Sequence, residues 1–109
     1  MYLTMNRFKV RLGQEAAFEA VWTGRDSQLP QVKGFVGFHL FKGPERDGHR
    51  LYASHTMWAS ETAFADWTRS DAFRAAHRGA GAHGEIYLGP PELEIFQSVQ
   101  HIGPDERAM

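Results

Sequence analysis

Apolar and polar side chains alternate from Tyr2 to Arg11, and this period of two predicts a β-strand. Asn6 shares one face of the strand with Thr4, Phe8 and Val10. Because Phe8 and Val10 are large and apolar, this face is expected to be buried. A buried amide is costly unless its hydrogen bonds are met. Asn6 is therefore expected either to bond to nearby backbone or to face a polar ligand.

A helix and a second strand are predicted next. The helix runs from Gln14 to about Leu29, before Pro30 and Gly34, and its apolar side carries Ala17, Phe18, Val21 and Trp22. The strand runs from Phe35 to Lys42 and is apolar on both faces, with Phe35 and Phe41 on one and Val36, Phe38 and Leu40 on the other. Both faces of such a strand need cover.

Two more strands complete the predicted sheet. Gly43 to His49 is rich in turn residues and predicts a hairpin loop. The third strand, Leu51 to Trp58, is expected to carry His55 and Met57 on one face and Tyr52 and Trp58 on the other. A glycine-rich loop from Gly79 to Pro91, which contains His83, precedes the last strand, Glu92 to Gln100.

Between the third and fourth strands, Ser60 to Arg78 predicts two short helices in series. Ser60 and Ser70 stand where N-caps belong, and each is followed by an acidic residue that suits a helix N-terminus. Helical spacing places Trp67 and His77 on the apolar sides of the two helices. Core packing for the indole and a favourable charge at a helix C-terminus for the imidazole are the ordinary interpretations.

The order β-α-β-β-α-β predicts an α+β, ferredoxin-like fold with an antiparallel sheet whose helices cover one face. The other face needs a cover that the chain does not supply. We therefore expect a homodimer packed sheet to sheet, a dimeric α/β barrel. The 109 residues are expected to form a single domain, residues 1–109, with a frayed tail over 102–109.

Composition excludes several classes of function. The chain has 12 basic and 13 acidic side chains and no basic stripe, so nucleic acid is not an expected partner. Its apolar runs are too short for a membrane span, and the first residues lack the apolar block of a secretory signal, so a cytoplasmic location is expected. The absence of cysteine excludes disulfides, thiolate ligands and covalently attached haem.

Four segments of the chain form a recognisable set: Met5 to Arg7, Lys33 to Phe38, Trp58 to Trp67 and Ala76 to Arg78. Together they resemble the bacterial haem-degrading monooxygenases of the IsdG type, in the antibiotic-biosynthesis-monooxygenase superfamily. The segments from Lys33 and from Trp58 to Phe64 are typical of the whole superfamily, including members without a cofactor. Asn6, Trp67 and His77 together are typical of the haem-degrading branch. The glycine-rich loop with His83 departs from its pattern.

The resemblance implies a role for each of these three residues. His77 would be the axial ligand of the iron of a non-covalently bound haem b, which is both cofactor and substrate. Asn6 would donate a hydrogen bond to dioxygen on the opposite side, and Trp67 would ruffle the porphyrin. Phe64 and Phe73 are candidates for ring contacts as well as for the core, and His83 is a rival axial ligand. Arg25, Arg74 and Arg78 are candidates for the propionates.

The implied reaction consumes O2, opens the ring and releases iron. Its electrons would come from an external donor, a reductase or a small reductant, because no flavin or nicotinamide motif is present. Two alternatives stay open. One is a cofactor-independent oxygenase acting on a quinol or polyketide, with His77 as base. The other is a haem-binding protein without catalysis.

Overall fold

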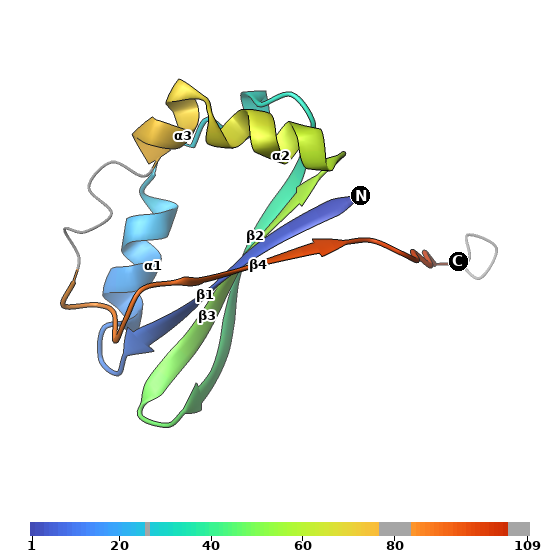
Figure 1. Cartoon of the computed structure of the whole chain (residues 1–109). Helices are drawn as coiled ribbons and strands as arrows, with labels where there is room; N and C mark the ends of the chain where they lie inside the picture. The colour runs from blue at the N-terminus through green and yellow to red at the C-terminus, as the bar shows by residue number, and fades with distance from the viewer. Residues whose placement is uncertain (26, 77–83, 105–109) are drawn as a thin grey trace.

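A computed structural model describes residues 1–25, 27–76 and 84–104 of the chain. Its elements follow the predicted order and are shown in Figure 1: β1 (Tyr2–Arg11), α1 (Glu15–Thr23), η1 (Leu29–Gln31), β2 (Phe35–Arg46), β3 (His49–Trp58), α2 (Glu61–Thr68), α3 (Asp71–Ala76) and β4 (Glu92–Gln97). The four strands form one antiparallel sheet in the order β2-β3-β1-β4. The predicted ferredoxin-like α+β fold is confirmed, and within one chain its sheet is open.

The three α-helices lie on one side of the sheet (Figure 1). The register puts Asn6 opposite Ser54 of β3, so both side chains point to this helix-covered face. Thr4, Phe8 and Val10 share that face and are buried, as expected. The opposite face, called here the open face, carries Leu3, Met5, Phe41, His55, Met57 and Phe96 by the same register.

The core lies beneath α1. Phe8, Val10, Phe18, Tyr52 and Ile86 form one buried cluster, against which Trp22 and Tyr87 pack. Ile86 belongs to the stretch predicted as a loop. The described part of this stretch forms turns and one isolated bridge between Val10 and Tyr87, so it is a loop, but its contribution to the core was not predicted. The backbone of this stretch pairs with the end of β1, since Arg11 N donates to Ile86 O at 2.8 Å and Leu88 N to Lys9 O at 2.9 Å.

The predicted hairpin loop is too long. β2 continues to Arg46, with a bulge between Lys42 and Glu45, and β3 already begins at His49. The turn is therefore the two residues Asp47 and Gly48, which have φ values of 53° and 80°. A two-residue Asp-Gly turn with both φ angles positive matches the twist of the flanking strands.

Two further predictions are wrong in detail. The first helix ends at Thr23, not near Leu29. Gly24 N donates to Ala20 O at 3.0 Å, and Arg25 N donates to Trp22 O at 3.4 Å, a shorter-range bond that closes the last turn. Phe35 was expected beside Phe41, but a register shift between Phe35 and Gly37 turns it to the helix-covered face. There its ring lies edge-on to Trp58, with centroids 6.0 Å apart.

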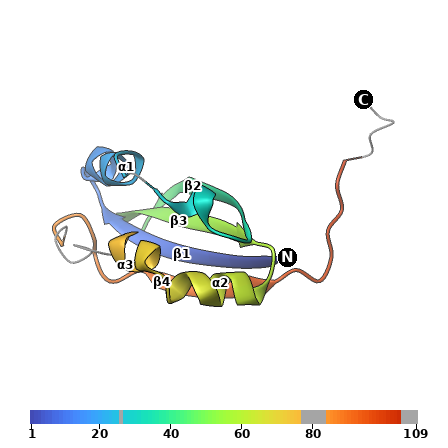
Figure 2. The same cartoon turned by 90° about the horizontal axis from the view of Figure 1, so that it is seen from above.

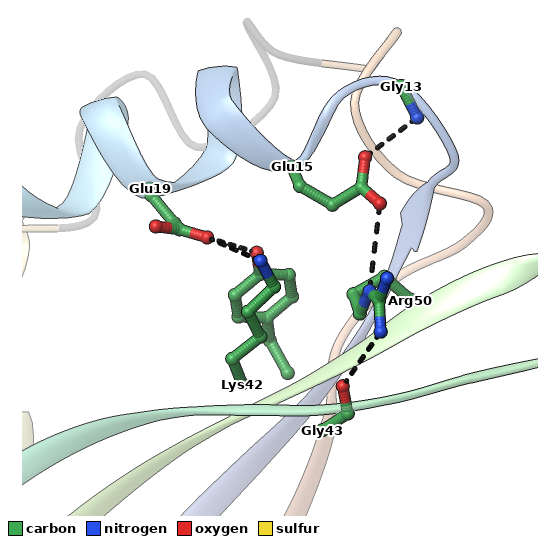
Figure 3. A network of polar contacts seen from close by, with 7 residues as sticks. Gly13, Glu15, Glu19, Lys42, Gly43 and Arg50 are labelled. Atoms are coloured by element: carbon green, nitrogen blue, oxygen red, sulfur yellow. Dashed lines mark hydrogen bonds and ion pairs between the residues drawn. The ribbon is translucent and has the colours of Figure 1, made fainter.

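Polar contacts attach α1 to the sheet beneath it (Figure 3). Glu15 accepts a hydrogen bond from Gly13 N at 2.7 Å, and its other oxygen lies 3.6 Å from Arg50 Nε. The Tyr52 hydroxyl donates to Glu19, whose carboxylate also lies 3.6 Å from Lys42 Nζ. Burial, with the nearby Glu19 carboxylate, raises the pKa of Tyr52, so the phenol stays protonated as a donor.

Acid should weaken the attachment of α1 through Glu15. Hydrogen bonds from its own backbone N–H and from Gly13 hold the pKa of this carboxyl below its usual 4.5. The stability it contributes is therefore fully present above pH 4.5 and is lost as the pH falls through the lowered pKa. Urea unfolding midpoints measured at a series of acidic pH values should fall less steeply for Glu15→Gln than for the unsubstituted chain. Parallel curves would contradict this.

Gly34 should be intolerant of a side chain. Its φ is +85°, and a Cβ there would lie 2.4 Å from the Cβ of Ala63 in α2. Gly34→Ala is expected to lower the free energy of unfolding by about 2 kcal/mol or more, from left-handed strain and overpacking. Gly37→Ala is the control, because nothing lies within 4 Å of its added Cβ. Urea unfolding of both variants is the measurement, and equal midpoints would refute the argument.

Candidate functional site

Asn6 lies at the middle of β1, on the helix-covered face and half-buried. Its cross-strand neighbours are Ser54 in β3 and Leu93 in β4. Among the described residues, its side-chain amide has no hydrogen-bond partner. Of the two alternatives left open for Asn6, a bond to nearby backbone is therefore not found within this part of the chain. An amide in this position is available to a ligand.

One aromatic group lies beside Asn6 towards α2 and α3. The buried Trp58 donates from Nε1 to Thr4 Oγ1 at 3.1 Å, and its ring centroid is 5.3 Å from that of Trp67. The ring of Phe73 meets Trp67 edge-on at 4.8 Å, which joins α3 to α2. Trp67 is half-buried and held between two other rings. Its indole ring is therefore held in one orientation on the same side of the sheet as Asn6.

The predicted serine caps give this helix pair its geometry. Ser60 Oγ accepts from Ala63 N at 3.2 Å, and Ser70 Oγ accepts from Phe73 N at 3.1 Å. The second cap starts α3 two residues after α2 ends, so the chain changes direction at that point. The two short helices then carry Trp67 and Phe73 towards each other.

Phe64 lies at the outer end of this group. Its ring centroid is 5.9 Å from that of Tyr2, the first residue of β1, and 5.8 Å from that of Trp58. These contacts are core packing beneath α2. A ring contact of Phe64 with a ligand, expected from the family resemblance, remains a prediction.

A second aromatic group lies on the other side of Asn6, beneath α1. Phe8 contacts Trp22, with ring centroids 5.5 Å apart, and Trp22 stacks on Phe38 of β2 at 5.8 Å. The exposed Arg25 places its guanidinium carbon 4.3 Å from the centre of the Trp22 ring. A cation held over an indole at the end of α1 is suited to an anionic group of a ligand.

The part of β4 beside Asn6 is apolar and open. Leu93 and Ile95 stand opposite Asn6 and Thr4 in the register and so face the helix-covered side, yet they are 53% and 46% exposed. Sequence reasoning missed both, although their alternation in the last strand is visible. Together with the two aromatic groups, they place apolar surface on three sides of the Asn6 amide, with Ser54 of β3 on the fourth. This arrangement is suited to a flat apolar ligand that accepts a hydrogen bond.

His77, Arg78 and His83 lie outside the described residues, so their predicted roles remain predictions. His77 directly follows Ala76, the last residue of α3. Among the described residues, no three His, Cys, Asp or Glu side chains gather into a possible metal site. No described helix is long and apolar enough to cross a membrane.

Two surface hollows lie away from Asn6. One, of about 240 Å³, is on the open face near the β2–β3 hairpin, and the other is beside Tyr2 and Ser60. Neither includes Asn6 or Trp67. The candidate site is thus not a hollow but a strip of the helix-covered face, formed by Asn6, Leu93 and Ile95 between the two aromatic groups.

Comparison with known proteins identifies the family. Residues 1–79 match the family described as "Antibiotic biosynthesis monooxygenase". The chain belongs to this monooxygenase family. A "Heme-degrading monooxygenase" of Shouchella clausii is 37% identical over 70 residues, which cover 63% of this chain and 64% of that protein. The match thus spans just under two thirds of that relative's length. The expected resemblance to the haem-degrading members is confirmed.

Two solved structures that are similar to this chain have different chemistry. The heme-degrader MhuD of Mycobacterium tuberculosis, with two hemes bound in its active site, has a TM-score of 0.72 and 27% identity, covering 94% of this chain and 100% of its own. SnoaB of Streptomyces nogalater, a cofactor-independent oxygenase, has a TM-score of 0.69 and 25% identity in its N63A mutant, covering 94% and 97%. The monooxygenase fold alone does not separate the two activities.

The unpartnered amide gives a test that needs no ligand. If Asn6 is kept for a ligand, Asn6→Leu should keep or raise the free energy of unfolding, by up to about 1 kcal/mol, because an unmet polar group leaves a half-buried position. Thr4→Val is the matched control two residues away on the same face. It removes the acceptor of the Trp58 indole and should cost about 1 kcal/mol. Chemical denaturation of both variants is the measurement. A loss for Asn6→Leu as large as that for Thr4→Val would indicate a structural Asn6.

Proposed function

We propose that this chain is a haem-degrading monooxygenase that binds haem along the strip between its two aromatic groups. The observation that carries the proposal is Asn6, a half-buried amide without a protein partner among the described residues, with an aromatic group on either side. The haem-degrading relatives of the family support it.

The chemistry of the residues present fits haem. Haem is flat and apolar with two carboxylates at one rim, and Leu93 and Ile95 offer exposed apolar surface on the same face as Asn6. When bound, haem would supply both the iron that activates dioxygen and the ring that is opened. The protein would supply the ligand atoms, the orientation and the electrostatics.

Each of the three proposed residues would have one task. His77 would hold the iron through a neutral imidazole nitrogen. The Asn6 amide NH2 would donate a hydrogen bond to the dioxygen that haem activates. Trp67, held by Trp58 and Phe73, would distort the macrocycle, which a freely rotating side chain could not do.

Arg25 is the best-supported candidate for a haem propionate. It is exposed, and its guanidinium lies over Trp22 at the α1 side of the strip. Arg74, the other described candidate, is paired with Asp71 in α3. Phe73 would hold Trp67 in place, and its own ring would also contact the porphyrin.

The remaining parts of the proposal are the partners. Electrons would come from an external reductase or a small reductant. The open face would be covered by a second copy of the chain, giving a dimeric α/β barrel, because two of its large side chains, Phe41 and Phe96, are 47% and 45% exposed. The proposed location is the cytoplasm.

The second candidate is a cofactor-independent oxygenase, which the likeness to SnoaB favours. In that case Asn6 and Trp67 would orient an aromatic substrate and His77 would act as a base. A substrate of that kind needs no iron ligand. Haem binding that depends on His77 therefore separates the two candidates.

Haemin titration tests the proposal, with ascorbate added in air after saturation. A Soret band should grow to a fixed stoichiometry and then bleach on reduction. His77→Ala should weaken binding at least tenfold and abolish the bleaching, because the axial ligand is lost. Asn6→Ala and Trp67→Phe should retain the Soret band and slow the bleaching. Arg25→Ala should weaken binding only.

His83→Ala is the matched control for the axial ligand and should leave the Soret band unchanged. A stable band that never bleaches would indicate a haem carrier. The absence of saturable binding would refute both the haem-degrading monooxygenase and the haem carrier, and quinol-type substrates would be tested next. Loss of the band in His83→Ala but not in His77→Ala would reassign the ligand.

A further inference from the structure

Asn6 shares its row of the sheet with a second polar side chain, Ser54. The register sets Asn6 of β1 directly opposite Ser54 of β3, with Leu40 of β2 and Leu93 of β4 at the two ends of the row. All four side chains face the helix-covered side of the sheet. The row therefore carries two adjacent polar groups with a leucine beyond each of them.

Ser54 is buried and its hydroxyl is unpaired. Its exposed fraction is 4%, and its side chain makes no hydrogen bond with any described residue. Burial of an unpaired hydroxyl is unfavourable, and alanine at the same position would avoid that cost. Folding alone therefore gives no reason for a hydroxyl at this place.

The hydroxyl of Ser54 is within reach of the Asn6 amide. Cβ atoms of directly opposite residues in an antiparallel pair lie about 4.5–5.5 Å apart, which a serine and an asparagine side chain can span with one hydrogen bond. Two threonines occupy the next row, Thr4 and Thr56. Thr4 Oγ1 already accepts from Trp58 Nε1 at 3.1 Å. Ser54 is thus the polar residue placed to contact Asn6.

The role proposed for Asn6 requires one orientation of its amide. Only the NH2 group can donate a hydrogen bond to an oxygen of a ligand, whereas the amide oxygen can only accept one. A half turn of the amide exchanges the two groups with little change in shape, so apolar neighbours cannot select between them. A donor beside the amide oxygen can, because it binds one orientation only. A serine hydroxyl is such a donor and adds no charge to an apolar surface.

The backbone holds the two residues at a constant separation. β1 and β3 are paired without interruption from Tyr2 to Arg11, and Asn6 and Ser54 lie at the middle of this ladder. In Figure 2 the two strands pass between α1 on one side and α2 and α3 on the other. A contact between the two side chains needs only side-chain rotation and no movement of a loop or helix.

We propose that Ser54 is a positioning residue whose hydroxyl donates to Asn6 Oδ1 when the ligand is bound and so turns the amide NH2 group towards that ligand. This inference rests on the role of Asn6 in the proposed function and adds the residue that orients it. Ser54 acts through Asn6 and does not itself touch the haem.

The infrared stretching band of carbon monoxide bound to the reduced haem complex tests this proposal. A hydrogen bond donated by the NH2 group lowers the frequency of this band, and the lone pairs of an amide oxygen turned to the same place raise it. The wild-type chain should show one band at low frequency. Ser54→Ala should add a second band at higher frequency, because both amide orientations become populated. Thr56→Val is the matched control, since it removes a hydroxyl from the same face of β3 one row away, and it should keep the single band.

The same substitution in an Asn6→Ala background separates positioning from a direct contact. There Ser54→Ala should leave the band unchanged, because the group through which Ser54 acts is missing. A change that persists in this background, or an unchanged band in Ser54→Ala alone, would overturn the inference while leaving haem binding intact. A wild-type chain that binds no haem would overturn the proposed function and this inference together.

Urea unfolding of the haem-free chain gives a readout that needs no ligand. Ser54→Ala should not lower the free energy of unfolding, because the hydroxyl it removes is buried and unpaired there. A marked loss of stability would assign the hydroxyl to the fold and would overturn the positioning role.

Discussion

The central place of β1 in the sheet is the constraint on which the candidate site depends. β1 is hydrogen-bonded along its length to β3 and over its first six positions to β4. Its side chains alternate between the helix-covered face and the open face, so a slip of one residue would move Asn6 to the wrong side. The buried Phe8 and Val10 prevent that slip, because it would expose them as well. The packing of the core thus fixes the position of a residue that contributes nothing visible to the core.

The helices explain why a polar position can persist between Thr4 and Phe8. α1 packs on one end of the sheet through Phe18 and Trp22, and α2 packs on the other through Phe64 and Trp67. Each helix is short, nine and eight residues. Rings therefore cover the two ends of the helix-covered face, while Leu93 and Ile95 stay exposed. The site follows from what two short helices leave uncovered.

Sequence reasoning predicted the element order, the buried face of β1, both serine caps and the two faces of β3, since each depends on local pattern. It missed features that depend on pairing between distant segments. Phe35 changes face because of a bulge, and Ile86 enters the core because its segment pairs with the end of β1. The exposed apolar face of β4 required the register with Asn6, which no local pattern contains. The hairpin turn could have been found, since Asp47-Gly48 is a strong two-residue turn signal.

β4 links the two surfaces for which functions are proposed. Leu93 and Ile95 face the candidate site, whereas Phe96 faces the open side. This strand is six residues long and pairs with β1 alone among the described strands. A strand that is hydrogen-bonded along one edge only becomes better ordered when a ligand or another chain packs on either of its faces. A ligand on one face and a second copy on the other would then stabilise the same strand. By linkage, each would raise the affinity of the other to the extent that the strand is incompletely ordered without them.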